Sequence, residues 1–378
     1  MNNITHEVMR GAPLLLHVFP GFAVGGAQSR MIAVANHFAG SFRHAVIALD
    51  GITTAAARFA PGLDVRFPGL VLRKQATLAN LWRCRAALTT LAPDVLVTHN
   101  WGSIEFALAN ALVGRRHVHI EDGFGPEERA RQLPRRVLAR RLLLRRASVV
   151  LPSRTLHRIA ADLWRLPPSC LRYIPNGIDL ARFAPAPGPV ASDWPRDLPV
   201  IGTVAALRPE KNLRRLLDAF ACLQVPARLV IVGDGPERAA LMAQAAALGI
   251  AARVIFAGAT EDTPRAYRQF DVFALSSDTE QMPLAVLEAM GTALPVAATN
   301  VGDVAAMLAP ANRPYVVAQQ AGALAAALTA LLADPAAARA LGAANRARAR
   351  QDFDQHAMFA AYAALFRAAA SAASGASQ

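Results

Sequence analysis

Short apolar runs alternate along the chain with stretches in which apolar residues recur every three or four positions. Runs such as LLLHVF (14–19) and RLVIVG (228–233) are apolar without a break, which is typical of strands covered on both faces of a parallel sheet. The first half predicts strands at 14–19, 44–50, 94–99, 117–120 and 148–153, with helices at 27–39, 78–91 and 103–113. The second half predicts strands at 200–207, 228–233, 253–258, 272–277 and 295–299, with helices near 212–222, 236–247, 263–269, 283–290, 303–309 and 321–333.

These two sets of alternating elements predict an α/β fold made of two Rossmann-like, doubly wound domains. The segment 184–199, APAPGPVASDWPRDLP, is rich in proline and small residues. We interpret it as the linker between a first domain of residues 1–183 and a second domain of residues 200–352. A last helix is expected over 353–370, where apolar residues again recur at helical spacing.

The composition is that of a globular protein with large apolar cores. Cys84, Cys170 and Cys222 show no C-x-x-C spacing, so they indicate neither a zinc site nor a disulfide framework. We expect them to be buried apolar residues in a reducing compartment. Residues 1–13 lack the basic and apolar regions of a signal peptide, and the longest alanine-leucine run, 321–333, is too short to span a bilayer. The expected location is therefore cytoplasmic.

Positive charge is concentrated in the first half of the chain. Residues 1–178 contain 23 Arg or Lys against 10 Asp or Glu, whereas the remaining 200 residues contain 17 of each. This asymmetry predicts an anionic partner for the first half, for which an anionic membrane surface and a nucleic acid are the two candidates. Aromatic residues are not interleaved with the arginines, which argues against nucleic acid as a partner.

The segment 129–147 carries arginine pairs at 135/136, 140/141 and 145/146. A spacing of five residues advances each pair by about 140° around a helix, so the pairs are expected to encircle the helix without forming one face. That pattern argues against a clean amphipathic helix at a membrane interface. Two interpretations remain open, an exposed solvated helix and a basic segment that attracts anionic headgroups.

Two glutamates eight positions apart, Glu280 and Glu288, stand in SSDTEQMPLAVLEAMGTALPVAAT (276–299). Glu280 is expected on a strand-to-helix loop and Glu288 about two turns inside the helix that starts at Pro283, a position where helices tolerate proline. The N-terminus of this helix favours an anion. The arrangement suits a ligand with a diphosphate and sugar hydroxyls, with Glu288 at a ribose and Glu280 at a transferred sugar. The alternative is a pair of ordinary surface glutamates.

At this point the chain resembles the family 4 glycosyltransferases, which are retaining enzymes of GT-B fold. Besides the E-x7-E loop, the resemblance is carried by four motifs in the same order, PGFAVGGAQSR (20–30), IPNGIDLARF (174–183), LRPEKN (207–212) and LVIVGDGPER (229–238) with VIFAG (254–258). It implies two Rossmann-like domains facing across a cleft, with the donor on the second domain and the acceptor on the first. It also implies that the C-terminal helix returns to the first domain.

For the donor, the resemblance places Lys211 at the diphosphate, where a fixed cation stabilises the charge that grows as the sugar leaves. The family's arginine five residues earlier is replaced by Ala206, and Arg208 is the nearby substitute. Arg238 occupies the position of the third glycine of G-x-G-x-x-G, which argues against a nicotinamide dehydrogenase. The expected donor contacts are Lys211, Arg208, Gly25, Gly26, Met282, Pro283 and Leu284 for the diphosphate, Glu288 for the ribose, and Gly233, Ala257 and Gly258 for the base.

For the reacting sugar, the family has a histidine-glycine pair where this chain has Asp122 before Gly123. Either Asp122 takes the role of that histidine or His119 reaches in from the preceding strand, and we prefer Asp122, with Glu280 as the third catalytic candidate. His99 and Asn100 end another predicted strand and are expected on the acceptor side. The predicted strand ends carry no D-x-D motif, so we expect no metal cofactor.

The sequence therefore predicts a retaining, hexosyltransferase-type glycosyltransferase. It would move a sugar from a UDP- or GDP-sugar to a hydroxyl acceptor, a glycan or a lipid-linked glycan, in cell-envelope or polysaccharide synthesis. The basic first domain suggests peripheral attachment to the inner face of the cytoplasmic membrane. Two alternatives remain, a non-catalytic nucleotide-sugar-binding partner, motivated by Ala206 and Asp122, and a GT-B epimerase of nucleotide sugars.

Overall fold

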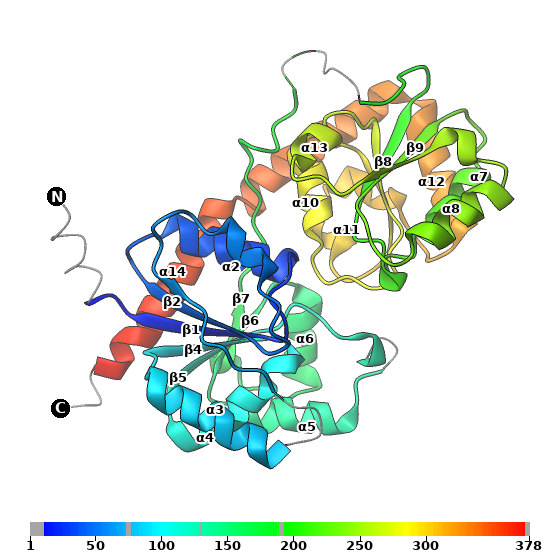
Figure 1. Ribbon diagram of the computed structural model, residues 1–378. Coiled ribbons are helices and arrows are strands. Elements are labelled where there is room, and N and C mark those ends of the chain that lie inside the picture. The colour runs from blue at the N-terminus through cyan, green and yellow to red at the C-terminus, as the bar shows by residue number, and fades with distance from the viewer. Residues whose placement is uncertain (1–10, 73–76, 129–130, 187, 189–192, 375–378) are drawn as a thin grey trace. The chain divides into compact units, whose positions relative to one another are not determined.

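The computed structural model describes residues 11–72, 77–128, 131–186, 188 and 193–374. The chain forms two compact units, one containing residues up to Pro175 and from Met358 onward, the other Asn176–Ala357 (Figure 1). It passes from the first unit to the second between Pro175 and Asn176, before the segment predicted as the linker. That segment belongs to the second unit, and its residues 187 and 189–192 lie outside the described residues.

A sheet of seven parallel strands forms the centre of the first unit, in the order β3-β2-β1-β4-β5-β6-β7. The strands are β1 (Leu14–Phe19), β2 (Arg43–Ala48), β3 (Val65–Arg66), β4 (Val95–His99), β5 (Arg116–Ile120), β6 (Ser148–Leu151) and β7 (Leu171–Tyr173). The order reverses between β1 and β4, so the helices that follow these two strands cover opposite faces of the sheet.

Helices cover both faces of this sheet (Figure 1). The helices are α2 (Gly26–His37), α3 (Thr77–Leu91), α4 (Ile104–Val113), α5 (Pro134–Leu143), α6 (Arg154–Asp162) and α14 (Gln355–Ser374). On one face, Val34 of α2 and the α14 residues Met358, Tyr362 and Phe366 share a core with β1, β4 and β5. On the other face, α3 and α4 share a core with β1 and β2.

A second parallel sheet, in the order β10-β9-β8-β11-β12-β13, forms the centre of the second unit. Its strands are β8 (Val200–Val204), β9 (Arg228–Val232), β10 (Val254–Gly258), β11 (Val272–Leu275), β12 (Val296–Thr299) and β13 (Val316–Val317). One core contains residues of α7 (Leu213–Ala221), α8 (Arg238–Ala247) and α12 (Ala321–Ala333). The other contains residues of α9 (Thr263–Tyr267), α10 (Leu284–Gly291), α11 (Val304–Met307) and α13 (Pro335–Asp352).

The predicted α/β class and the two Rossmann-like domains are confirmed. The structure adds the short strands β3, β7 and β13 and the helices α6 and α13, which the sequence analysis missed. The expectation that all three cysteines are buried is wrong for Cys222, which is exposed because it caps the end of α7, whereas Cys84 and Cys170 are buried. All three are free thiols.

Within the part of the chain that the structure describes, no single helix has both the length and the hydropathy needed to cross a bilayer. Helices α12 and α13 meet that requirement only as a pair, and they are bent by 104° relative to each other. The bend falls at Asp334, whose side chain caps α13 by accepting hydrogen bonds from the backbone N–H groups of Ala336 and Ala337.

Changing Gly202 to Ala is expected to lower the free energy of unfolding by about 1–3 kcal/mol, the usual effect of overpacking a core. Gly202 lies inside β8, and a Cβ atom there would overlap the ring of buried Phe270. Urea unfolding followed by circular dichroism measures the change. The matched control is Gly322→Ala on α12, where a Cβ would meet nothing and stability should stay equal or rise. Equal stability of Gly202→Ala and wild type would contradict the packing described here.

Candidate active site

Two loops leave the sheet of the second unit at the point where its strand order reverses. The order changes direction between β8 and β11, which is where ligands bind in doubly wound sheets. Residues 205–212 follow β8, and residues 276–283 follow β11. Because the two strands are adjacent and parallel, both loops start at the same edge of the sheet.

Lys211 and Glu280 meet across these two loops. The Lys211 Nζ atom donates a hydrogen bond to Glu280 Oε1 at 2.6 Å, and Ser277 Oγ donates to the same oxygen at 2.8 Å. The side chain of Lys211 is 26% exposed and that of Glu280 is 11% exposed. Both contacts use Oε1, so Oε2 keeps its capacity to accept a hydrogen bond from a ligand. An anion bound to Lys211 would compete with Glu280 for the ammonium group.

A second ion pair ties the same two loops together. Arg215 of α7 contacts Asp278 at 2.6 Å, and Asn212 Nδ2 donates to the same Asp278 oxygen at 3.0 Å. Asn212 has a φ of 42° and caps α7 by accepting a hydrogen bond from the backbone N–H of Arg215. The loop after β11 is therefore held against the loop after β8 by contacts other than the Lys211–Glu280 pair.

The predicted diphosphate contacts Met282, Pro283 and Leu284 lead directly into α10. Asn176 of the IPNGIDLARF motif donates from Nδ2 to the carbonyl oxygen of Met282 at 2.8 Å. Pro283 takes the capping position with φ −68° and ψ 125°, so Leu284 is the first helical residue, one position later than predicted. The first N–H groups of a helix lack partners within it and carry partial positive charge. This helix start lies close after Glu280 in the chain and offers hydrogen-bond donors to an anion.

Glu288 lies on the second turn of α10 and is half-buried. Burial raises the pKa of its carboxyl group to about 7, while a hydrogen bond with Tyr267 and the positive charge of Arg182 act in the opposite direction. Tyr267 is fully buried, and burial together with the charge of Glu288 raises its own pKa above the ordinary value. Glu288 is therefore close to its protonation midpoint near neutral pH, and a hydroxyl group donating to it would favour the carboxylate form.

The predicted base contacts gather at the ends of β9 and β10. The backbone N–H of Gly233 donates to the carbonyl oxygen of Gly258 at 2.8 Å, and Ala257 is exposed next to it. Gly233 has a φ of 135°, and a Cβ atom there would overlap the carbonyl oxygen of Ala205, so this turn requires glycine. Arg208 is exposed on the loop after β8.

In the first unit, hydrogen bonds with two other residues fix the position of Asp122. Arg30 of α2 binds its carboxylate through two parallel hydrogen bonds, Nη1 to Oδ1 at 2.6 Å and Nη2 to Oδ2 at 2.9 Å. Asn100 Oδ1 accepts a hydrogen bond from the backbone N–H of Asp122 at 2.7 Å. Burial alone would lower the pKa of Arg30, but the charge of Asp122 outweighs burial and the pKa is raised overall. The Asp122 side chain remains 20% exposed.

Asn100 has an unusual backbone conformation, with φ 58° and ψ 174°. This region of backbone dihedrals is essentially reserved for glycine and costs other residues about 1–3 kcal/mol. The conformation is fixed by neighbours, because the Asn100 N–H donates to the Ile120 carbonyl at 2.9 Å and its carbonyl accepts from the Ser103 hydroxyl at 2.9 Å. The strained residue presents its side chain to Asp122, which makes this strand end a functional candidate.

His119 and His99 are both buried within the first unit. His119 is 0% exposed, and its Nδ1 lies 2.8 Å from the Thr98 hydroxyl. His99 is 1% exposed and stacks on Phe19, with ring centroids 3.7 Å apart. Both imidazoles are enclosed by protein whereas the Asp122 carboxylate is partly exposed, so burial favours Asp122 over His119.

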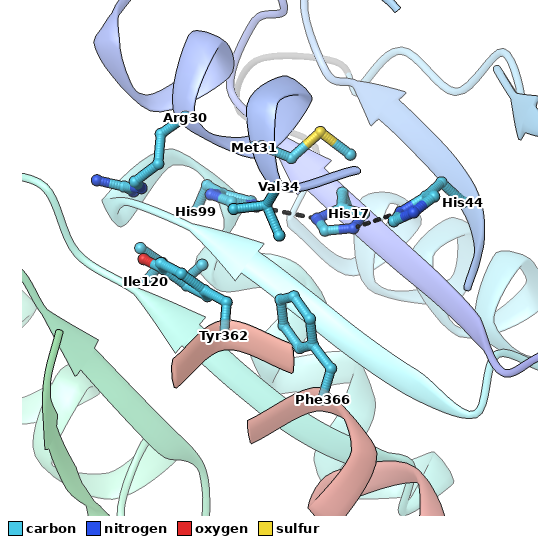
Figure 2. Close-up of a pocket in the computed structure, with 9 residues that line it drawn as sticks. All are labelled: His17, Arg30, Met31, Val34, His44, His99, Ile120, Tyr362 and Phe366. Carbon is cyan, nitrogen blue, oxygen red and sulfur yellow. Dashed lines mark hydrogen bonds between the residues drawn. The ribbon is translucent and has the colours of Figure 1, made fainter. Parts of the chain in front are cut away.

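His99 belongs to a row of three buried histidines beside a small cavity (Figure 2). His17 Nδ1 lies 3.3 Å from His99 Nε2, and His17 Nε2 lies 3.2 Å from His44 Nδ1. Burial lowers the pKa of all three, that of His44 to about 4, so they are neutral at neutral pH. The cavity of about 20 Å³ is also lined by Arg30, Met31, Val34, Ile120, Tyr362 and Phe366.

Gly25 and Gly26 lie at the start of α2, where Gly25 takes the capping position and Gly26 is exposed. A helix N-terminus offers backbone N–H groups, and this one follows the loop after β1. The described residues include no group of three or more His, Cys, Asp or Glu side chains arranged to hold a metal ion.

The spacing of residues along the sequence did not identify several of the side chains that support the site. Some of them lie inside the sequence motifs, and membership in those motifs was the only available sign of their importance; they are Arg30, Asn176, Arg182, Ser277 and Asp278. Arg215 and Tyr267 were identified by the structure alone.

Two family models match the chain, one in each half. Residues 24–182 match the family described as Glycosyltransferase Family 4, and residues 189–348 match the family described as Glycosyl transferases group 1. The two matches leave only the ends and a short middle segment uncovered. The chain belongs to the family 4 glycosyltransferases, which confirms the resemblance drawn from the motifs.

Curated relatives carry glycosyltransferase names. A GDP-mannose-dependent alpha-(1-6)-phosphatidylinositol monomannoside mannosyltransferase of Mycolicibacterium smegmatis is 33% identical over 197 residues, which are 48% of this chain and 52% of the relative. A 2-deoxystreptamine glucosyltransferase of Streptomyces kanamyceticus is 29% identical over 323 residues, which are 78% of this chain and 83% of the relative. The chain thus spans about half the length of the first of these relatives.

Solved structures of the same fold cover nearly the whole chain. The Anabaena protein HepE in complex with UDP-glucose matches with a TM-score of 0.79 and 19% identity, over 94% of this chain and 100% of that one. Sucrose-phosphate synthase from Thermosynechococcus elongatus matches with a TM-score of 0.78 and 21% identity, over 96% and 100%. At these identities the likeness concerns the fold, and it confirms the predicted GT-B class.

Changing Glu288 to Gln is expected to alter the pH dependence of stability. A carboxyl group whose pKa is 4.5 in the unfolded chain and about 7 in the folded chain stabilises the fold fully only below pH 4.5. The wild type loses this contribution as the pH rises through 7, and Gln, which does not ionise, loses nothing. Urea unfolding across this pH range should therefore shift in favour of the variant by at most roughly 3 kcal/mol. A difference between the two proteins that stays constant with pH would contradict the assignment.

Proposed function

We propose that the chain transfers a sugar from a nucleotide-diphosphate sugar to a hydroxyl acceptor with retention of anomeric configuration. The bond between the anomeric carbon and the diphosphate oxygen breaks, a bond to the acceptor oxygen forms, and the acceptor proton passes to the departing phosphate or to water. The observation that carries the proposal is the meeting of Lys211 and Glu280 next to the start of α10, at the switch point of the second sheet. Family membership supports the same reaction class.

On the donor side, the diphosphate is taken by Lys211 and by the first N–H groups of α10. The negative charge of the leaving diphosphate grows during transfer, and a fixed ammonium group with fixed backbone dipoles stabilises that charge. Glu280 loses part of its contact with Lys211 when the diphosphate binds and accepts hydrogen bonds from the sugar. Glu288 accepts from the ribose, and the exposed backbone at Ala257 meets the base. Arg208 supplies the positive charge that Ala206 lacks.

On the sugar side, Asp122 acts as a fixed hydrogen-bond acceptor. A carboxylate can accept about four hydrogen bonds, and Arg30 uses one position on each oxygen. The remaining positions suit hydroxyl groups of a sugar. Because Arg30 fixes both oxygens of this carboxylate, its role is binding and orientation. Arg30 and Asn100 are positioning residues that act through Asp122.

The acceptor is a glycan or a lipid-linked glycan in cell-envelope or polysaccharide synthesis, and the reaction runs without a metal cofactor at the inner face of the cytoplasmic membrane. The positive charge of the first half supports a membrane-associated acceptor. The M. smegmatis relative, whose name specifies a phosphatidylinositol mannoside, supports the same class of acceptor.

Purified protein incubated with UDP, GDP and their sugars is expected to show a higher melting temperature with one nucleotide, because a ligand stabilises the fold it binds. Lys211→Ala should reduce turnover of that donor about 100-fold, the usual effect of removing one stabilising charge or donor. The matched control is Arg214→Ala, since Arg214 at the start of α7 forms an exposed pair with Glu237, the residue before α8, and should change turnover less than about twofold. Equal turnover of Lys211→Ala and wild type would overturn the donor site.

The products distinguish the remaining functions. Mass spectrometry and NMR of the products would show a new glycoside for a transferase and an isomeric donor for an epimerase. Tight donor binding without either product would identify a non-catalytic binding protein.

Replacing Arg30 by Lys is expected to lower sugar transfer about 10- to 100-fold while the affinity for the nucleoside diphosphate stays within twofold, because Lys cannot form two parallel bonds to Asp122.

Asn100→Gly removes the hydrogen bond to Asp122 but relieves the strained backbone. We therefore expect lower transfer without lower thermal stability. Calorimetry with UDP or GDP separates nucleotide binding from transfer. Wild-type transfer in both variants would show that Asp122 needs no positioning.

A further inference from the structure

Helix α5 has one face that no other part of the described chain covers. Counted at 100° per residue, its exposed positions Pro134, Arg135, Leu138, Arg141 and Leu142 fall within an arc of about 120°. Leu138 lies at the middle of this arc, Leu142 lies between Leu138 and Arg135, and the two leucines are 55% and 56% exposed. Arg135 and Arg141 lie at its two edges, and the exposed Arg145 and Arg146 follow directly after the helix.

The opposite face of α5 is neutralised by acidic side chains. Arg140 is 0% exposed and contacts Glu121 at 3.2 Å and Glu128 at 3.1 Å. Arg136 contacts Glu127 at 2.6 Å and Glu128 at 3.1 Å. The pairs 135/136 and 140/141 are thus divided, with one member paired inward and the other exposed, whereas Arg145 and Arg146 are both exposed.

Aromatic rings hold the inward arginines in place. The Arg140 guanidinium lies 4.9 Å from the ring centroid of Trp101 and 5.0 Å from that of Trp164. Arg136 lies 5.0 Å from the Trp101 ring. The expectation that the arginines encircle the helix without forming one face is therefore wrong for the exposed positions. Arg136 and Arg140 point into the unit, and the other arginines of the three pairs form an outward face with Leu138 and Leu142.

We propose that this face, Arg135, Leu138, Arg141 and Leu142 with Arg145 and Arg146, docks the protein on an anionic lipid bilayer. Exposed leucines flanked by arginines match an interfacial helix, in which the apolar side chains enter the headgroup boundary and the guanidinium groups reach the lipid phosphates. The segment 129–147 contains no Asp or Glu, so the outward face has charge complementarity to anionic lipids.

The proposal rests on the proposed function in one respect, the membrane-associated acceptor, and names the surface that brings the first unit to it. Docking through α5 leaves the carboxyl end of β4 and Asp122 to the sugar substrates. Because two leucines alone bind a bilayer weakly, the surface should act reversibly and depend on anionic lipid.

The test is sedimentation of the full chain with vesicles of phosphatidylcholine alone and of equal parts phosphatidylcholine and phosphatidylglycerol. We expect binding to the anionic vesicles only, weakened by added salt. Leu138→Ser with Leu142→Ser should weaken binding about tenfold, and Arg135→Glu with Arg141→Glu should weaken it at least as much, at roughly fivefold or more for each arginine. All substituted side chains are exposed, and circular dichroism checks that the fold is kept.

Matched controls come from exposed side chains of the second unit. Met242→Ser on α8, where Met242 is 49% exposed, and Arg339→Glu on α13 should bind vesicles like the wild type. Absence of preferential binding to anionic vesicles, or equal losses in the control and α5 variants, would overturn the proposal. Loss with the arginine variant but not with the leucine variant would also overturn it, because the face would then attract polyanions without entering a bilayer.

Measuring UDP and GDP binding on the same preparations separates the two hypotheses. The α5 variants should bind nucleotide like the wild type. Vesicle binding without nucleotide binding would refute the proposed function and leave the docking surface supported. Nucleotide binding and sugar transfer without vesicle binding would refute the docking surface and leave the proposed function supported.

Discussion

The reversal of strand order in each parallel sheet is the constraint on which the candidate sites depend. Where two adjacent strands send their helices to opposite faces, the loops after them separate at the carboxyl edge and leave polar backbone uncovered. In the second unit these loops carry Lys211 and Glu280. In the first unit β1 and β4 end at the same kind of edge, with α2 starting after β1 and Asn100 following β4. Side chains at these edges can be both held by the fold and reached by a ligand.

The two ion pairs at these edges differ in a way that matches different tasks. Arg30 and Asp122 form two parallel bonds, and the arginine is almost fully buried, so the pair is a fixed part of the first unit. Separating it would take the carboxylate away from a buried guanidinium group, which is strongly unfavourable. Lys211 and Glu280 form a single contact that is partly exposed, and such pairs exchange readily with solvent or ligand. The first pair is suited to holding a group still, and the second to rearranging when substrate binds.

Much of the fold could be predicted from the sequence, because buried parallel strands are continuous apolar runs and most long helices show their spacing. Short edge strands such as β13 contain too few residues to leave a pattern, and α13 was missed because its alanine- and arginine-rich sequence has little contrast between its faces. In the site, spacing identified Glu280 and the family resemblance identified Lys211, but neither gave information on Arg30 as the partner of Asp122, which is 92 residues away. Contacts at such separations are set by sheet order, which no local pattern encodes. The same limit explains α5, where only the packed structure shows that Arg136 and Arg140, and not their neighbours Arg135 and Arg141, meet glutamates.

The row of His44, His17 and His99 has a consequence for the range of conditions in which the first unit survives. These imidazoles resist protonation in the folded chain, and the unfolded chain binds protons there from about pH 6.5 downward, so acid favours unfolding. Tyr362 and Phe366 of the C-terminal helix line the same cavity. Repulsion among the newly charged rings, which lie next to Arg30, would therefore first weaken the packing of α14 against the sheet of the first unit. The acid limit of the first unit is thus built into its own interior, whereas Lys211, Glu280 and Glu288 belong to the second unit.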